Sequence, residues 1–198
     1  MLTNNFKNIT VILLAGGQSS RMGKDKGLIE FNGKPLIEHI TEKVRLITDS
    51  VFIITNQPGY DRFGFPCFPD IKKDCGPIGG IFTGLHHSST LKNLVLSCDT
   101  PFIPHHLIKH LVEQSGVEDA LVPRYDEKTE PLCGVYDRNC KETLKMLIDE
   151  RELKLQNALE KLNTRFLDLH RFDDFDKRWF ANINTPDELE KYQIKPKD

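Results

Sequence analysis

Residues 9–26 read ITVILLAGGQSSRMGKDK, an apolar run that passes through two glycines into a cationic loop. Apolar, β-branched residues bounded by glycine predict a strand buried on both faces. The glycines let the backbone approach a ligand closely. Three cations follow them: Arg21, Lys24 and Lys26. Backbone N–H groups and cations after a first strand are typical of a polyphosphate site; the alternative is an ordinary strand-to-helix turn with solvated charges.

The composition suits one globular domain. The chain has 198 residues, 38% of them hydrophobic, and we expect a single domain over residues 1–198 with flexible ends at 1–7 and 192–198. Its 27 basic and 29 acidic residues leave a net charge of -2, so no global field attracts nucleic acid. An anionic ligand would have to be held by a local cluster of cations.

The cysteines and the apolar runs indicate the compartment. The five cysteines form no Cys-x-x-Cys pair and are odd in number, which argues against both a disulfide framework and a zinc site. Residues 1–7 lack the pattern of a signal peptide. The longest apolar run is far shorter than the roughly 18–20 residues that span a bilayer. We therefore expect a cytoplasmic protein with no membrane partner.

Predicted strands and helices alternate along the chain. We expect strands at 9–14, 50–55, 65–68, 93–97, 119–123, 132–136 and 164–168, and an extended stretch at 180–184. We expect helices at 35–48, 76–88, 104–114, 139–148 and 153–162, and another from Thr185 onward. The alternation predicts an α/β fold, a single-domain three-layer α/β/α arrangement with a mostly parallel, Rossmann-like nucleotide-binding sheet. Ligands of such sheets bind at the carboxyl ends of the strands, where this chain carries Ala15 to Lys26, Asn56 and Asp99.

The common phosphate and hydrolase motifs do not fit this sequence. No stretch supplies the G-x-x-x-x-G-K-[ST] of a P-loop, and the opening loop lacks the G-x-G-x-x-G of dinucleotide-binding folds. No G-x-S-x-G elbow exists, which excludes the usual α/β-hydrolase arrangement.

Four other pieces of sequence narrow the class. They are LAGG at 14–17 with RMG at 21–23, Lys26 and GKPL at 33–36; Asp70 with GPIGG at 76–80; SCDTPF at 97–102; and NINTP at 182–186. In this order, across residues 9–189, they resemble the molybdenum cofactor guanylyltransferase family of nucleotidyltransferases. Ile78 and Gly79 stand where the family usually has leucine and alanine, which keeps size and apolarity roughly intact.

The resemblance implies an activity and a set of partners. The protein would transfer GMP from GTP to the terminal phosphate of molybdopterin (the molybdenum cofactor), forming the guanine dinucleotide cofactor and pyrophosphate. Because two anions must meet, Mg²⁺ is the implied cofactor. The implied partners are GTP and molybdopterin, with molybdenum-insertion proteins and target molybdoenzymes or their chaperones as further candidates.

The same resemblance assigns roles to individual residues. The predicted catalytic residues are Arg21, Lys26 and Asp99, and Asp99 is also the predicted metal ligand. The predicted GTP-binding residues are Leu14, Ala15, Gly16, Lys26, Asn56, Asp70, Gly80 and Asp99. The predicted acceptor-binding residues are Asn182 and Asn184, whose amides suit a pterin edge. Structural alternatives are a helix cap for Asp99, a turn for Asn56 and helix packing for Gly80. Asn182 and Asn184 could instead serve as turn or capping residues, and Arg21 and Lys26 as solvated surface cations.

Two other functions stay open at this point. One is a cytidylyltransferase, or another nucleotidyltransferase that acts on a different phosphorylated small molecule. The other is a non-catalytic nucleotide-binding regulator, which Arg21, Lys26 and Asp99 argue against because binding alone needs fewer charges.

Overall fold

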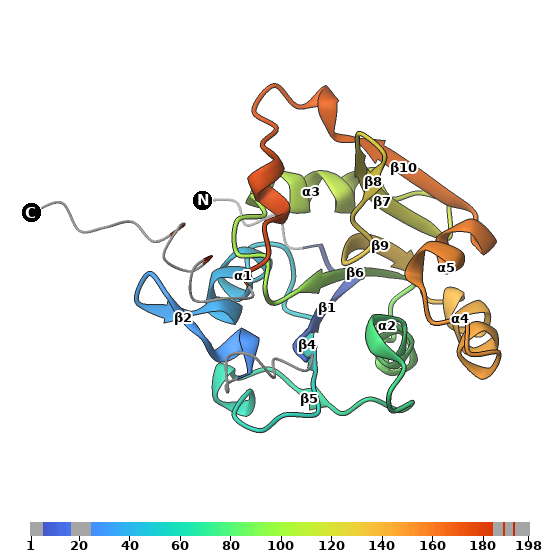
Figure 1. Ribbon diagram of the computed structural model, residues 1–198, viewed down its shortest axis with the longest axis horizontal. Helices are drawn as coiled ribbons and strands as arrows, with labels where there is room; N and C mark the ends of the chain where they lie inside the picture. Colours follow the sequence, from blue (N-terminus) through green and yellow to red (C-terminus); the bar gives the residue numbers. More distant parts are fainter. Residues whose placement is uncertain (1–5, 17–24, 184–187, 189–191, 193–198) are drawn as a thin grey trace, which may run out of the picture.

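A computed structural model of the protein describes residues 6–16 and 25–183, together with Glu188 and Tyr192. Its centre is an eight-stranded sheet, in which seven strands follow the order β10-β7-β9-β6-β1-β4-β5 and β8 pairs with β7 (Figure 1). The strands are β1 (Ile9–Leu14), β4 (Val51–Ile54), β5 (Cys67–Phe68), β6 (Lys92–Ser97), β7 (Ala120–Tyr125), β8 (Lys128–Thr129), β9 (Cys133–Asp137) and β10 (Thr164–Asp168).

The sheet is mixed but mostly parallel. β1 pairs in parallel with β4 and β6, β4 with β5, and β7 with β10. β9 runs antiparallel to both of its neighbours, β6 and β7. The predicted α/β class and the mostly parallel sheet are confirmed. The direction of β9 has a consequence for the site, because β9 begins at the edge of the sheet where β6 ends.

Helices cover both faces of the sheet, as Figure 1 shows. They are α1 (Leu36–Val44), α2 (Gly76–His87), α3 (His105–Gln114), α4 (Cys140–Asp149) and α5 (Leu155–Lys161). Alternate β1 residues point to opposite faces: Val11 and Leu13 pack in the cluster that contains α1 and α3 residues. Ile12 and Leu14 pack in the cluster with α2, α4 and α5 residues. This burial on both faces explains why every β1 residue except Thr10 is apolar.

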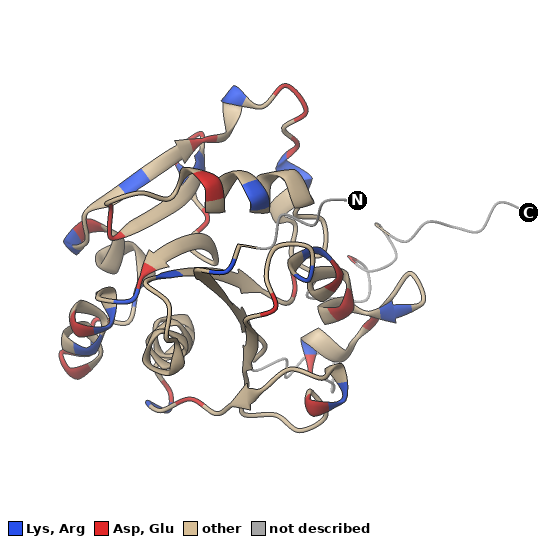
Figure 2. Ribbon diagram, turned by 180° about the vertical axis from the view of Figure 1, so that it is seen from behind, with Lys and Arg blue, Asp and Glu red and all other residues tan. Residues whose placement is uncertain are grey.

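The charged residues lie mostly on the outer elements (Figure 2). Lys and Arg alternate with Asp and Glu over the helices and loops, while the inner strands carry few of either kind. No helix in the described part of the chain is long and apolar enough to cross a membrane.

Helix α1 is shorter than the predicted 35–48. Pro35 ends β3 (Lys34–Pro35), which pairs with β2 (Glu30–Phe31) in a short hairpin. The two-residue loop Asn32-Gly33 has positive φ angles of 48° and 81°, the conformation that asparagine and glycine tolerate best. At the other end, the Thr48 hydroxyl donates to the Ile9 carbonyl (3.1 Å), which ties residue 48 to β1 after the helix has ended.

The segment near the C-terminus also differs from its prediction. Phe180 was expected to be extended, but it ends the 3₁₀ helix η4 (Lys177–Phe180). The Asp176 carboxylate caps this helix by accepting from the Arg178 N–H (2.8 Å). Trp179, in the same turn, is buried and packs its ring edge-on to His106 and Phe175. The predicted helix from Thr185 falls largely outside the described residues, and the flexible ends and single-domain boundary stay predictions.

Candidate active site

Polar side chains gather at the edge of the sheet where β1, β4, β5 and β6 end. Asp99 follows β6, Asn56 follows β4, Asp70 follows β5 and Gly16 follows β1. The parallel registers Leu14↔Ser97 and Ile54↔Phe68 bring these strand ends to one side of the sheet. This edge is where ligands bind in parallel α/β sheets.

Asp99 occupies the middle of this edge. One carboxylate oxygen accepts a hydrogen bond from the Ser97 hydroxyl (2.5 Å), and the other lies 3.6 Å from the ammonium of Lys26. The Asp99 side chain is 14% exposed and that of Lys26 is 27% exposed, so both can be reached from solvent. The Asp99 carbonyl accepts from the Ile183 N–H (3.1 Å), which anchors the following segment, with Asn182, beside the carboxylate.

Lys26 is held by a short 3₁₀ helix, η1 (Lys26–Leu28). Asp25 caps this helix by accepting from the Gly27 N–H (3.2 Å), and its carboxylate also accepts the Tyr60 hydroxyl. Tyr60 is 1% exposed, and burial raises the pKa of its hydroxyl, so it stays a donor. A Cβ on Gly27 would collide with the Tyr60 hydroxyl, which leaves room for glycine alone. Tyr60 was not predicted, because no sequence signal links it to residue 25.

Asn56 and Asp70 form one unit at the β4–β5 side of the edge. The Asn56 amide donates to Asp70 Oδ2 (2.7 Å), and its carbonyl oxygen accepts from the Asp70 N–H (3.0 Å). Asp70 Oδ1 is buried and makes no hydrogen bond within the described part of the chain. Burial raises the pKa of the Asp70 carboxyl, although the Asn56 hydrogen bond opposes this shift. A buried acceptor without a donor is a reason to look for a ligand.

Gly80 and Leu14 complete this side. A Cβ on Gly80 would lie 3.1 Å from the Leu14 side chain and 3.8 Å from Asp70 Oδ1, so glycine lets α2 pack closely against the end of β1, beside Asp70. The Ala15 N–H donates to the Ile54 carbonyl (2.9 Å), and the Leu14 carbonyl accepts from the Cys98 N–H (3.1 Å). Because the Ala15 N–H is already used in this way, the backbone group of Ala15 that could contact a ligand is its carbonyl.

The unpartnered Asp70 carboxylate leads to a prediction about stability. Its raised folded-state pKa means that the stability from the protonated carboxyl is present below the usual value of 3.8 and lost as the pH rises through the folded-state pKa. Asp70→Asn removes that charge, so we expect a melting temperature about 1–3 °C above the unsubstituted protein at pH 7, with the difference shrinking as the pH falls towards 3.8.

Melting curves across this pH range test the prediction. Asp61→Asn, at an exposed position on η2 (Asp61–Phe63), is the matched control and should not shift the melting temperature in this way. An Asp70→Asn protein that is less stable at neutral pH would mean that the carboxylate stabilises the fold.

A cavity of about 200 Å³ opens on the other side of Asp99. Asp99, Ser97 and the predicted acceptor residue Asn182 line it, together with Glu130, which was not predicted. Apolar side chains form much of the remaining wall, among them Ile103, Leu132, Leu155 and Phe180. Asp99 therefore lies between two chemically different regions, the Asn56–Asp70 side and this cavity.

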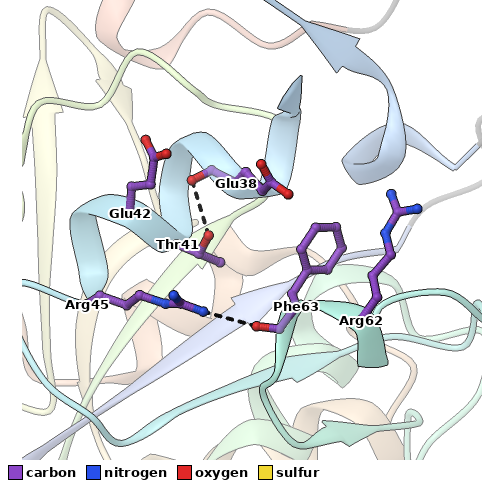
Figure 3. Close-up of a pocket in the computed structure, with 6 residues that line it drawn as sticks. All are labelled: Glu38, Thr41, Glu42, Arg45, Arg62 and Phe63. Atoms are coloured by element: carbon purple, nitrogen blue, oxygen red, sulfur yellow. Dashed lines mark hydrogen bonds between the residues drawn. The ribbon is translucent and has the colours of Figure 1, made fainter. Parts of the chain in front are cut away.

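A second cavity, of about 240 Å³, lies elsewhere (Figure 3). Residues of α1 and η2 line it, and none of the predicted site residues does. The Arg45 guanidinium donates across it to the Phe63 carbonyl (3.1 Å). Its two arginines are balanced by two glutamates, so the cavity lacks the excess of positive charge that a phosphate would need.

The structure brings together most of the predicted site residues, namely Leu14, Ala15, Gly16, Lys26, Asn56, Asp70, Gly80, Asp99 and Asn182. Arg21 and Asn184 lie outside the described residues. No group of three or more His, Cys, Asp or Glu side chains in the described part of the chain could hold a metal by itself.

The fold and the site edge together define a class, the nucleotidyltransferases, whose α/β architecture this sheet shares. The family model for the MobA-like NTP transferase domain matches residues 11–165, and the chain belongs to this family. The resemblance that the four motifs indicated is thereby confirmed, as is the prediction of an enzyme.

Individual relatives match over nearly the whole chain. A probable molybdenum cofactor guanylyltransferase of Flavobacterium johnsoniae is 38% identical, over 95% of this chain and 98% of the relative. A molybdenum cofactor guanylyltransferase of Vibrio parahaemolyticus is 36% identical, over 91% and 93% of the two chains. The crystal structure of the molybdopterin-guanine dinucleotide biosynthesis protein A from Archaeoglobus fulgidus has a TM-score of 0.78 at 30% identity, covering 92% and 95%.

Proposed function

We propose that this protein transfers GMP from GTP to the terminal phosphate of molybdopterin and releases pyrophosphate. Relatives that carry this activity in their names match it at 36–38% identity over at least 91% of the chain. The observation that carries the proposal is the position of Asp99, which lies beside Lys26 and between the Asn56–Asp70 pair and a separate cavity. A transferase that joins two anionic substrates needs such a meeting point.

The reaction requires few chemical groups from the protein. An acceptor phosphate oxygen attacks the α-phosphorus of GTP in line, a new P–O bond forms, and the bond to the β-phosphate breaks. Because the acceptor is already an anion, no general base is needed, and catalysis consists of positioning and charge stabilisation. Lys26, held by η1 at the strand edge, would contact the outer phosphates and stabilise the departing pyrophosphate.

The residues present fit a magnesium ion. Mg²⁺ is commonly bound by one or two protein carboxylates, with substrate phosphates and water as the other ligands. Asp99 offers one carboxylate that Ser97 orients, and a partly exposed oxygen ligand suits this hard cation. When bound, the ion would neutralise charge on the phosphates at the reacting centre.

On the nucleoside side, Asn56, Asp70 and Gly80 would contact the base or ribose. Asp70 Oδ1 would accept a donor from the ligand, since it has none among the described residues. We infer that Asn182 contacts the acceptor from the cavity side. The reaction would take place in the cytoplasm, with molybdenum-insertion proteins and molybdoenzymes or their chaperones on either side of it.

Nucleotide preference is the direct test of this function. With Mg²⁺ present, GTP at about 100 times its Kd should add roughly 2.7 kcal/mol of stability, which raises the melting temperature by about 5–11 °C. CTP and ATP at the same concentration should produce much smaller shifts. Stabilisation by CTP and none by GTP would instead favour the cytidylyltransferase alternative. Product formation from labelled GTP and molybdenum-loaded molybdopterin then tests transfer itself.

A further inference from the structure

Glu130 lies on the wall of the cavity beside Asp99, yet none of the motifs in the sequence points to it. It sits between β8 and β9, and its N–H donates to the Pro123 carbonyl (3.0 Å) while its carbonyl accepts from the Cys133 N–H (3.0 Å). Because β9 runs against β6, with Leu96 opposite Cys133, the residues that precede β9 reach the edge where β6 ends. If β9 ran parallel to β6, the residues that follow β9, and not those that precede it, would lie at this edge.

The Glu130 carboxylate is held in place and half-buried. Its Oε1 accepts from the Tyr125 hydroxyl (3.2 Å), and this is the only hydrogen bond to the carboxylate within the described residues. The Tyr125 ring is buried and stacks on Phe180, with the ring centroids 5.7 Å apart and 15° between the planes. Phe180 in turn lines the cavity. Burial raises the pKa of the Glu130 carboxyl, so leaving this carboxylate unpaired is unfavourable.

The cavity suits a flat ring with hydrogen-bond donors on one edge. Ile103, Leu132 and Leu155 provide apolar contact, while Glu130 and Asn182 provide the polar contacts. Its volume of about 200 Å³ is below the roughly 300–1,000 Å³ of pockets for whole drug-sized ligands, so it would take one end of a larger molecule.

We propose that Glu130 is a specificity-determining residue of the acceptor site, whose carboxylate accepts hydrogen bonds from the 2-amino group and the adjacent ring N–H of a pterin. This inference rests on the proposed function. Two parallel N–H donors match the two oxygens of a carboxylate, as they do in arginine–carboxylate pairs. The pterin edge then lies at Glu130, and the phosphate of the acceptor extends along the cavity towards Asp99.

Guanine presents the same donor edge, so GTP is the competing occupant. The sheet order argues for the pterin, because Glu130 lies on the β9 side of Asp99, whereas Asn56 and Asp70, the residues proposed to contact the nucleoside, lie on the β4–β5 side. Asp70 would therefore contact the guanine and Glu130 the pterin, from opposite sides of the reacting centre.

The test is the steady-state kinetics of Glu130→Gln with molybdopterin and GTP varied separately. Glutamine keeps the size of the side chain and an oxygen that can accept from Tyr125, so the fold should survive, which a melting curve checks. We expect the KM for molybdopterin to rise about tenfold or more and the KM for GTP to stay unchanged. The matched control is Glu127→Gln, at an exposed position on the turn between β7 and β8, which should change neither KM.

The sign of the effect separates recognition from simple charge. If Glu130 only repelled the anionic acceptor, its neutralisation would lower the KM for molybdopterin, and that result would overturn the proposal. An unchanged molybdopterin KM, or a rise in the GTP KM, would do the same. Failure of the unsubstituted protein to transfer GMP at all would count against the proposed function rather than against this assignment.

A second measurement compares pterin with lumazine as inhibitors of the unsubstituted enzyme. Lumazine carries an oxygen in place of the 2-amino group and so presents an acceptor to the Glu130 carboxylate. We expect pterin to inhibit competitively with molybdopterin and at least about tenfold more strongly than lumazine. Equal effects of the two compounds, including none from either, would contradict the assignment.

Discussion

Replacement of Asp99 by alanine should lower the turnover number at least about 10²-fold, the effect of removing one preorganised electrostatic group from a reacting centre. The Asp99 carboxylate lies beside Lys26 at the end of β6. Its loss would remove the proposed ligand for Mg²⁺ and leave the Ser97 hydroxyl without its acceptor. Initial rates with saturating GTP and molybdopterin measure the effect.

Two further variants separate chemistry from folding. Asp99→Asn keeps the oxygen that accepts from Ser97 and the backbone carbonyl that accepts from Ile183, so its melting temperature should stay close to that of the unsubstituted protein. Its turnover should nevertheless fall to a similar extent, because the charge is gone. Asp61→Ala, at an exposed position, should leave turnover unchanged. A loss of less than tenfold in Asp99→Asn would show that Asp99 is not the principal metal ligand.

Lys26→Ala should weaken the binding of GTP about tenfold or more and change the binding of GMP little. The reason is geometric: the Lys26 ammonium lies 3.6 Å from an Asp99 oxygen, at the place where the outer phosphates would meet the metal ligand. A hydrogen bond between charged groups contributes enough free energy for a tenfold change in affinity. Calorimetric titrations of both nucleotides in the presence of Mg²⁺ give the comparison.

The control for Lys26 is a lysine that also lies close to a carboxylate but is remote from the site. Lys109 on α3 forms a surface ion pair with Glu113 one helical turn away, and Lys109→Ala should change neither affinity. Equal weakening of GTP and GMP in Lys26→Ala would place the ammonium at the α-phosphate or the nucleoside instead of the outer phosphates.

Most of the strand and helix pattern could be predicted from the sequence, because each main strand is a run of apolar residues between turn signals. The strand ends could be predicted for the same reason, which is why Asn56 and Asp99 were identified, whereas Asp70 was assigned from the family resemblance. That Asn56 and Asp70 form a hydrogen-bonded pair could not be predicted, since the pairing depends on β5 lying beside β4. Strand order and side-chain contacts across the sheet leave no periodic trace in the sequence.

Two site residues illustrate what local patterns miss. The Tyr60 hydroxyl donates a hydrogen bond to Asp25, 35 positions away in the chain, and only the folded structure brings the two residues together. Glu130 reaches the site because β9 is antiparallel, and an apolar strand has the same appearance in either direction. The two short strands that flank Asn32-Gly33 were not predicted, because the hairpin has only two residues on each side.

The antiparallel strand β9 also determines how the molecule comes apart. It is the only connection in the described sheet between β6 and β7, and Gly134 within it has no room for a Cβ, which would lie 3.0 Å from the Leu121 carbonyl oxygen. Detaching β9 would split the sheet into a β6-β1-β4-β5 part and a β7-β8-β10 part. Local opening there would separate Glu130 from Asp99, so the integrity of the proposed site depends on the pairing of β6 with β9.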